Sequence, residues 1–253
     1  MIVLPMAGLS SRFFKAGYEV PKYMLDLNGQ STFLHALNSF EAMFGRETIL
    51  IICRADYDTP DFVRAECRKA GLSDDDVELV VLDRETDGQA ETVSRGLTQA
   101  QADPAAPLTI FNIDTFRPGF THPTAFDVTA IDGYVEVFRG PGTHWSFVRP
   151  DPADPDAFRA AEVAEKVRIS DLCSTGLYFF RDVALFQGLY APIAEKDPAT
   201  LQGGERYIAP LYNDAIGQGL DIRYALIDAH EVQFCGTPAE YDALRAGSGP
   251  TDP

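Results

Sequence analysis

Basic residues are scarce in this 253-residue sequence, which has 21 lysines and arginines against 38 aspartates and glutamates and a formal net charge of −17. Proteins that bind nucleic acid or anionic membrane surfaces present basic faces to the phosphates. The charge balance therefore argues against both kinds of partner. A phosphate site in such a chain has to be built locally, from backbone N–H groups and a few well-placed cations.

Cysteine is also sparse, and no two of the four cysteines have CxxC spacing: Cys53, Cys67, Cys173 and Cys235. This pattern is typical of reduced thiols in a cytosolic protein and not of a disulfide framework or a zinc site. Long apolar runs are missing as well, because no segment approaches the roughly 18 continuous apolar residues of a membrane span. The sequence predicts a globular protein of the cytoplasm.

Strand and helix patterns alternate through the first half of the chain. The expected strands are residues 2–5, 48–54, 77–82 and 108–114. Between these strands, apolar residues recur at helical spacing, and Thr59 and Thr86 are expected to cap two of the helices. Such βαβ units predict an α/β fold with a mostly parallel sheet and helices on both faces.

The second half changes rhythm. Strand patterns at residues 133–138, 145–150, 162–169 and 174–180 follow one another without helices between them. They predict an antiparallel extension of the sheet. Helical patterns return at residues 183–194 and 207–217, a last strand is expected at 220–227, and Thr237 and Glu240 are expected to cap a terminal helix.

Small residues and an arginine come directly after the first strand. Ala7, Gly8, Ser10 and Ser11 allow backbone N–H groups to approach phosphate oxygens, and Arg12 adds a bidentate cation. The alternative is an ordinary strand–helix turn with a surface arginine. No Walker A ending and no complete GxGxxG is present, which argues against P-loop and dinucleotide-binding sites.

Three further charged residues are candidates for the same chemistry. Lys22 follows Pro21, whose fixed φ aims the lysine, and the alternative is a lysine that faces solvent. Asp114 ends an expected strand, where a carboxylate can hold Mg²⁺ or serve as a turn residue. Lys166 is adjacent to Glu165 in an expected strand, so alternation sends the two side chains to opposite faces. Lys166 is either a second phosphate ligand or an exposed edge lysine.

These motifs together resemble a known family. LPMAGLSSRF…VPK, DGQAETV, NID, EK and STGLYFF follow one another in the order and approximate spacing of the sugar-phosphate nucleotidyltransferases. The resemblance is to the nucleotide-sugar pyrophosphorylases and the related cytidylyltransferases, particularly the short bacterial enzymes of capsule and surface-polysaccharide pathways. The resemblance covers about residues 1–240. It implies a three-layer α/β/α Rossmann-like fold of the glycosyltransferase-A type.

The resemblance also implies an organisation and an activity. One nucleotidyltransferase domain would span residues 1–246, with a nucleotide-binding half (1–118), an acceptor-binding half (119–246) and a disordered tail at 247–253. The enzyme would transfer a nucleoside monophosphate from a nucleoside triphosphate to a phosphorylated acceptor and release pyrophosphate, with Mg²⁺ as cofactor. CTP is favoured over UTP or dTTP by the likeness to the capsule enzymes.

The family's functional positions map onto this sequence as follows. The nucleotide-binding positions are Ala7, Gly8, Ser10, Ser11, Arg12 and Gly88. The catalytic cations are Arg12, Lys22 and Lys166, and the metal ligand is Asp114. The acceptor-binding positions are Trp145, Ser146, Glu165, Lys166 and Gly176.

Two rival functions are left open, and the first of them rests on a departure from the family pattern. Phe234 stands where many relatives carry a second metal-binding aspartate, so Asp228 or Glu231 completes the site, or Asp114 and the phosphates hold the ion alone. A non-catalytic nucleotide-binding relative is therefore one alternative. The other is a metal-dependent glycosyltransferase, which usually needs a DxD motif that the segment DTF lacks.

Overall fold

The computed structural model describes residues 1–247, so residues 248–253 of the expected tail lie outside the described residues. The chain forms two compact units. The N-terminal unit comprises Ile2–Glu85, Phe111–Phe120 and the described residues from His230 onward. The central unit comprises Met1, Thr86–Ile110 and Thr121–Ala229. Within residues 1–247, no helix is both long enough and apolar enough to cross a membrane.

The N-terminal unit is built on a parallel sheet. Its strands are β1 (Ile2–Pro5), β4 (Ile49–Arg54) and β5 (Val77–Leu82). β4 is paired in parallel with β1 on one side and with β5 on the other. β1 and all of β4 except its last residue are buried, as the continuous apolar runs predict. The first turn of this unit is α1 (Ser11–Lys15), the hairpin is β2 (Asp26–Leu27) with β3 (Gln30–Ser31), and the longer helices are α2 (Thr32–Asn38) and α3 (Thr59–Lys69).

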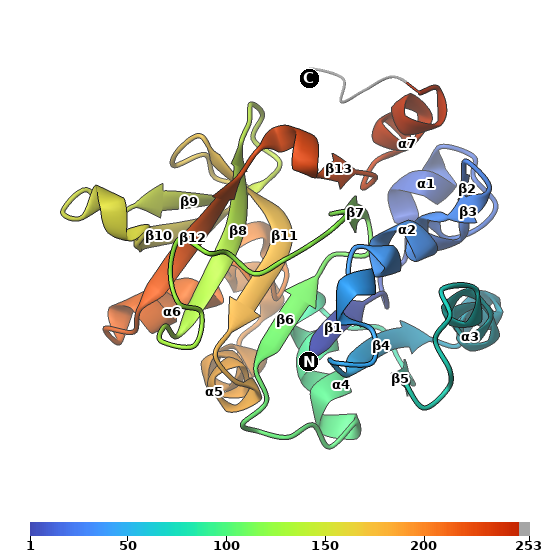
Figure 1. Ribbon diagram of the computed structural model, residues 1–253, viewed down its shortest axis with the longest axis horizontal. Helices are drawn as coiled ribbons and strands as arrows, with labels where there is room; N and C mark the ends of the chain where they lie inside the picture. The colour runs from blue at the N-terminus through green and yellow to red at the C-terminus, as the bar shows by residue number, and fades with distance from the viewer. Residues whose placement is uncertain (248–253) are drawn as a thin grey trace. The chain divides into compact units, whose positions relative to one another are not determined.

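The C-terminal segment belongs to this N-terminal unit. Strand β13 (Gln233–Phe234) pairs antiparallel with β7 (Thr115–Phe116). Helix α7 (Pro238–Arg245) begins with the predicted capping box, in which the Thr237 hydroxyl and the Glu240 carboxylate each accept a backbone N–H. In Figure 1 α7 lies beside α1 and β2, and the Tyr241 hydroxyl donates to the Asp26 carbonyl over 2.6 Å.

The central unit carries the antiparallel part of the sheet. Its strands are β6 (Leu108–Phe111, whose last residue is counted with the N-terminal unit), β8 (Gly133–Arg139), β9 (Ser146–Pro150), β10 (Ala160–Glu165), β11 (Leu172–Phe180) and β12 (Ile222–Ile227). β11 runs antiparallel to β8 and β9, β10 runs antiparallel to β9, and β12 runs parallel to β8. The helices are α4 (Gln89–Gln99), α5 (Val183–Ala194) and α6 (Leu211–Gly217). Figure 1 shows the long strands β8, β11 and β12 running beside one another.

Several expected boundaries are wrong, each for a local reason. The expected strand 162–169 ends at Glu165, because Lys166 takes a left-handed conformation with φ of 55°. The expected helix from residue 207 begins only at Leu211, directly after Pro210. The residue before α3 is Asp58, and Thr59 is the first helical residue instead of the cap.

The expected cap at Thr86 is also wrong. Gly88 precedes α4 and no side chain caps that end. The Thr86 hydroxyl pairs with Thr92, while Glu91 accepts the Asp87 N–H over 2.9 Å. The expected strand 108–114 ends at Phe111, which places Asp114 in the turn before β7.

Candidate active site

The loop after β1 folds back onto the segment that carries Lys22. Ser10 adopts a left-handed conformation with φ of 52° and ends the loop where α1 begins. Its hydroxyl accepts the backbone N–H of Lys22 over 3.1 Å. Lys22 opens a short 3-10 turn after Pro21, and its carbonyl accepts the Thr32 hydroxyl over 2.5 Å. Two sequence-predicted elements, the loop and the lysine, are therefore tied together within the N-terminal unit.

Lys22 and Asp114 form an ion pair. The Lys22 Nζ lies 2.5 Å from Asp114 Oδ2, although the residues are far apart in the chain. The two side chains are 24% and 21% exposed. The pair is thus partly open to solvent, so that a phosphate or a metal ion can reach it.

The segment that holds Phe234 lies beside Asp114. The backbone N–H of Cys235 donates to the Asp114 carbonyl over 2.8 Å, and Phe234 is opposite Thr115 in the short ladder. Burial raises the pKa of the Cys235 thiol to about 12, so this neighbour is a neutral thiol. The Glu231 carboxylate is engaged elsewhere, 3.1 Å from a guanidinium nitrogen of Arg117.

A second carboxylate, that of Glu240, lies close to Gly236, as the Asp114 carboxylate does. A methyl group added at Gly236 would lie 3.0 Å from Asp114 Oδ2 and 3.6 Å from Glu240 Oε2. The two carboxylates therefore flank Gly236. The sequence predicts Glu240 only as a helix cap, and the structure confirms that cap.

The donor set around Asp114 fits a magnesium ion that substrate phosphates help to hold. In the part of the chain that the structure describes, no three acidic, histidine or cysteine side chains gather as a metal cluster. Mg²⁺ is usually held by one or two carboxylates together with substrate phosphates and water, and it does not need an all-protein cage. Asp114 supplies one such carboxylate in a partly exposed position.

A cavity of about 630 Å³ opens at the same loop in the N-terminal unit. Its lining includes Ala7, Gly8, Leu9, Arg54 and Tyr57. Tyr57 is 55% exposed and stacks on Phe14 with ring centroids 5.6 Å apart. The cavity thus combines open backbone, an aromatic face and a cation, which are groups that can receive part of a nucleotide.

Glu165 and Lys166 lie next to each other in the central unit instead of on opposite faces. Their carboxylate and ammonium groups are 3.9 Å apart, because the left-handed Lys166 breaks the alternation of the strand. Glu165 is buried and accepts the Ser146 hydroxyl. Burial raises the pKa of the Glu165 carboxyl above its ordinary value, while the Ser146 hydrogen bond and Lys166 oppose that rise.

The Lys166 ammonium rests against a residue that the sequence does not single out. Its Nζ donates to the Tyr207 hydroxyl and lies 4.4 Å from the centroid of the Tyr207 ring. The Lys166 side chain is 38% exposed. The lysine is thereby aimed while its charge stays accessible. Tyr207 follows GGER, a segment with no recognisable motif.

The other acceptor-side predictions occupy the same unit. The backbone N–H of Lys166 donates to the Trp145 carbonyl over 2.9 Å, and the Trp145 indole N–H donates to the Pro141 carbonyl. Gly176 has φ of 86° inside β11, where the register with β8 shifts. Trp145, Ser146, Glu165 and Lys166 are therefore connected, while Gly176 marks an irregular point of the neighbouring strand.

Gly88 is required for a close backbone approach. It has φ of 137°, and a Cβ at this position would lie 2.6 Å from the backbone nitrogen of Arg206. No other residue type fits there without moving the Arg206 segment. Gly88 as a contact of the nucleotide base stays a prediction, and the structure adds a packing reason for the glycine.

Comparison with known proteins places the fold. A nucleoside-diphosphate-sugar pyrophosphorylase from Vibrio cholerae RC9 is 46% identical, with 97% of this chain and 100% of that chain covered and a TM-score of 0.88. A putative glucose-1-phosphate thymidylyltransferase from Bacillus anthracis, solved with a sucrose, is 17% identical (98% and 94% covered, TM-score 0.74). The inositol-1-phosphate CTP transferase from T. maritima is 14% identical (100% and 96% covered, TM-score 0.72). No protein-family model and no curated protein matches the sequence.

The two distant structures share the fold alone, while the Vibrio cholerae structure shares sequence along nearly the whole chain. These matches confirm the predicted α/β nucleotidyltransferase fold, with its mostly parallel sheet and antiparallel part. They also confirm the family that the motifs resemble. The chain therefore belongs to the nucleoside-diphosphate-sugar pyrophosphorylases and is an enzyme of the nucleotidyltransferase class.

Proposed function

We propose that the protein transfers a nucleoside monophosphate from a nucleoside triphosphate to a sugar phosphate and releases pyrophosphate. The observation that carries this proposal is the 46% identity to a nucleoside-diphosphate-sugar pyrophosphorylase over 97% of the chain. The ion pair between Lys22 and Asp114 supports it, because it joins a cation and a carboxylate beside the small-residue loop.

The N-terminal unit would bind the triphosphate. In this proposal the backbone of Ala7, Gly8, Ser10 and Ser11 faces the phosphates, Arg12 neutralises the outer ones and Lys22 lies at the α-phosphate. Gly88 would contact the base. The cavity beside Ala7 and Gly8 supports this assignment, since it is open, partly aromatic and adjacent to the loop.

Asp114 would hold the magnesium ion. The ion, when bound, supplies positive charge to the phosphates and to the departing pyrophosphate. Lys22 contacts Asp114 in the structure. When the ion occupies that carboxylate, the Lys22 ammonium would be available to neutralise the α-phosphate. Phe234 supplies no carboxylate, so the phosphates complete the coordination in this proposal.

The acceptor would be bound by the central unit. Lys166 is the cation for the acceptor phosphate, and Tyr207 holds its ammonium group. Glu165 and Ser146 supply a linked carboxyl and hydroxyl for the polar groups of the acceptor. Trp145 and Gly176 complete this side.

The reaction would need alignment and charge neutralisation and no general base. A phosphate monoester has a second pKa of about 6, so its attacking oxygen is already ionised at neutral pH. Both reactants are anions, and the cations reduce their repulsion and orient the attack on the α-phosphorus. This accounts for a proposed set of functional residues that contains no histidine.

The finer assignments are part of the same proposal. CTP is the favoured donor, with UTP and dTTP as alternatives, and the acceptor is a sugar 1-phosphate or a related building block of a capsule or surface polysaccharide. The acidic composition suits a small-molecule enzyme of the cytoplasm, with no role on nucleic acid or membranes.

Pyrophosphate release tests the proposal. The purified protein is incubated with Mg²⁺, each nucleoside triphosphate and a panel of sugar 1-phosphates, and thermal unfolding is measured with each nucleotide alone. A nucleotide at 100 times its dissociation constant adds roughly 2.7 kcal/mol of stability. Release that requires both substrates supports the proposal. Nucleotide binding without release would favour the non-catalytic alternative, and release of a nucleoside diphosphate from a nucleotide sugar would favour a glycosyltransferase.

A further inference from the structure

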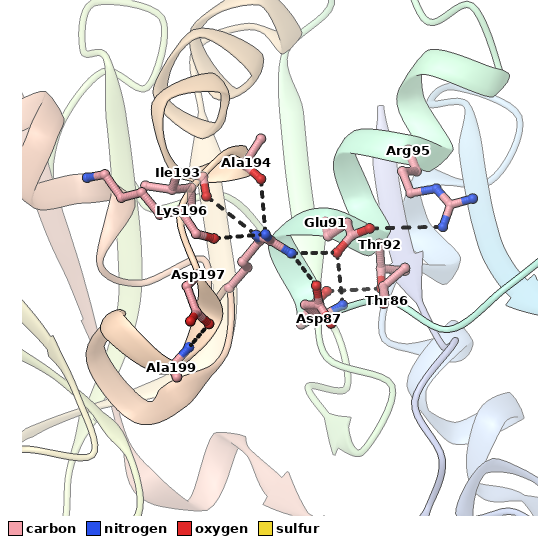
Figure 2. A network of polar contacts seen from close by, with 12 residues as sticks. Thr86, Asp87, Glu91, Thr92, Arg95, Ile193, Ala194, Lys196, Asp197 and Ala199 are labelled. Carbon is pink, nitrogen blue, oxygen red and sulfur yellow. Dashed lines mark hydrogen bonds and ion pairs between the residues drawn. The ribbon is translucent and has the colours of Figure 1, made fainter.

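Arg206 is a buried cation at the centre of a polar network in the central unit. It is only 8% exposed. One guanidinium nitrogen donates to Asp87 Oδ2 over 2.5 Å and to Glu91 Oε2 over 3.0 Å. The other two donate to the backbone carbonyls of Ile193, Ala194 and Lys196. Figure 2 shows the carboxylates converging from one side and the end of α5 from the other.

The backbone of Arg206 is joined to the same turn. Its N–H donates to the Asp87 carbonyl over 2.7 Å, and its carbonyl accepts the Ala90 N–H over 2.8 Å. Gly88 lies against this backbone so closely that a Cβ would be 2.6 to 2.9 Å from three of its atoms. Side chain and main chain of one residue thus fix the turn from Asp87 to Glu91.

The next residue, Tyr207, contacts the acceptor side. The Tyr207 hydroxyl accepts a hydrogen bond from the Lys166 ammonium, and the Tyr207 ring lies beneath that ammonium. Four residues before Arg206, the Gln202 side-chain oxygen accepts the Glu165 N–H over 2.9 Å. The segment from Gln202 to Tyr207 therefore contacts the Glu165–Lys166 pair as well as the Gly88 turn.

The chemistry of the network indicates that it holds segments in position and does not mainly add to the stability of the fold. A buried ionic network is often no more stabilising than apolar residues of the same volume, because desolvation offsets the attraction. A guanidinium offers five donors in one rigid plane, which a lysine ammonium cannot reproduce. Arg206 directs these donors to a turn on one side and to three carbonyls on the other, and so sets the distance between them.

We propose that Arg206 is a positioning residue that fixes the Gly88 turn and Lys166 relative to each other, so that one short segment places groups for both substrates. The inference deepens the proposed function, on which it rests, since that function assigns Gly88 to the nucleotide and Lys166 to the acceptor phosphate. Arg206 itself touches neither substrate. It acts through Asp87 and Gly88 in one direction and through Tyr207 in the other.

Hydrogen exchange tests the positioning without any substrate. Arg206→Lys keeps the positive charge near Asp87 and Glu91 but loses most of the carbonyl contacts. We expect faster amide exchange in the peptides that cover residues 87–92 and 162–168. The control is Arg223→Lys, which changes an arginine of β12 paired with Asp221 at 2.9 Å. Unchanged exchange in either peptide, or the same change in the control, overturns the proposal. If Arg206→Lys does not fold, Asp87→Asn removes the negative charge that Arg206 contacts, and the same two peptides decide.

Kinetics test the connection to the reaction. Arg206→Lys is expected to raise the KM for the acceptor and the KM for the nucleotide about five- to tenfold each, which corresponds to losing one charge-assisted contact. In a Lys166→Met background the further rise in acceptor KM should disappear, while the rise in nucleotide KM persists. If the increases in acceptor KM caused by Arg206→Lys and Lys166→Met are additive in the double variant, Arg206 does not act on the acceptor through Lys166. If the wild-type protein releases no pyrophosphate with any substrate pair, the proposed function fails, and the exchange result still decides whether Arg206 positions the two elements.

Discussion

Lys22 Nζ and Asp114 Oδ2 form a 2.5 Å ion pair within the N-terminal unit. Without a ligand, each group neutralises the other, and neither carries a free charge. A bound metal ion would take over the carboxylate and release the ammonium for a phosphate. The pair would therefore link cation binding at Asp114 to the availability of Lys22, and substitutions of its two members should differ in effect.

Replacing Lys22 should impair the chemical step more than the fold. Lys22→Met removes the charge proposed to lie at the α-phosphate, and turnover should fall about 100- to 1,000-fold. The partly exposed ion pair contributes only about 0–1 kcal/mol to stability. Thermal unfolding and pyrophosphate release measure the two effects. Lys15→Met, on the exposed side of α1, is the control, and equal activity in both variants would remove Lys22 from the site.

Replacing Asp114 should change the magnesium dependence. Asp114→Asn keeps the shape of the side chain but removes the charge proposed to hold the ion, so turnover should fall at least about 100-fold. We also expect the Mg²⁺-dependent part of the thermal shift with nucleotide to vanish, which is a readout independent of turnover. Asp61→Asn changes an exposed aspartate of α3 and serves as control. Wild-type magnesium titrations in Asp114→Asn would contradict the assignment.

Replacing Lys166 should affect the acceptor and spare the nucleotide. Lys166→Met removes the proposed phosphate ligand, and the KM for the sugar phosphate should rise about tenfold or more, as expected for the loss of a charge-assisted hydrogen bond. The thermal shift with nucleotide alone should stay as in the wild type. Lys196→Met, an exposed lysine of the same unit, is the control. A weakened nucleotide shift in Lys166→Met would place this lysine on the donor side instead.

The sequence predicts regular elements well where one physical signal dominates. Short apolar patterns place β1 and β5 at their observed bounds, and the Thr237–Glu240 pattern predicts the capping box of α7. These signals are local, because each depends only on neighbouring residues. The pairing of Lys22 with Asp114 is predicted less directly, from the rule that ligands gather at the carboxyl ends of parallel strands.

The rest depends on contacts between distant segments, which leave no local pattern. Lys166 looks like a strand residue, but its left-handed conformation and its contact with Tyr207 turn it toward Glu165. Arg206 carries the densest polar network around the Gly88 turn, yet in the sequence it is a single arginine in GGERY. Buried ion pairs between segments more than a hundred residues apart cannot be read from spacing.

Glu165 offers a prediction on pH. Burial raises its pKa above the ordinary value of 4.5, so the folded protein favours the protonated form. The stability contributed by that form is fully present below the ordinary value and is lost as the pH rises through the raised pKa. Glu165→Gln keeps an acceptor for the Ser146 hydroxyl and never ionises. The melting temperature of Glu165→Gln should therefore rise relative to that of the wild type as the pH rises, by about 2–4 °C for each kcal/mol of stability that the wild type loses.

The measurement is thermal unfolding of both proteins between about pH 4 and pH 8, the range over which a raised carboxyl pKa acts. Glu162→Gln is the matched control, because Glu162 lies on the same strand but is only partly buried and is paired with Arg149. A difference that grows with pH in Glu165→Gln and stays flat in Glu162→Gln supports a carboxyl that burial keeps partly protonated. A difference that shrinks with rising pH would mean that the Ser146 hydroxyl and Lys166 outweigh burial. Glu165 would then meet the acceptor as a carboxylate that accepts hydrogen bonds and not as an acid that donates one.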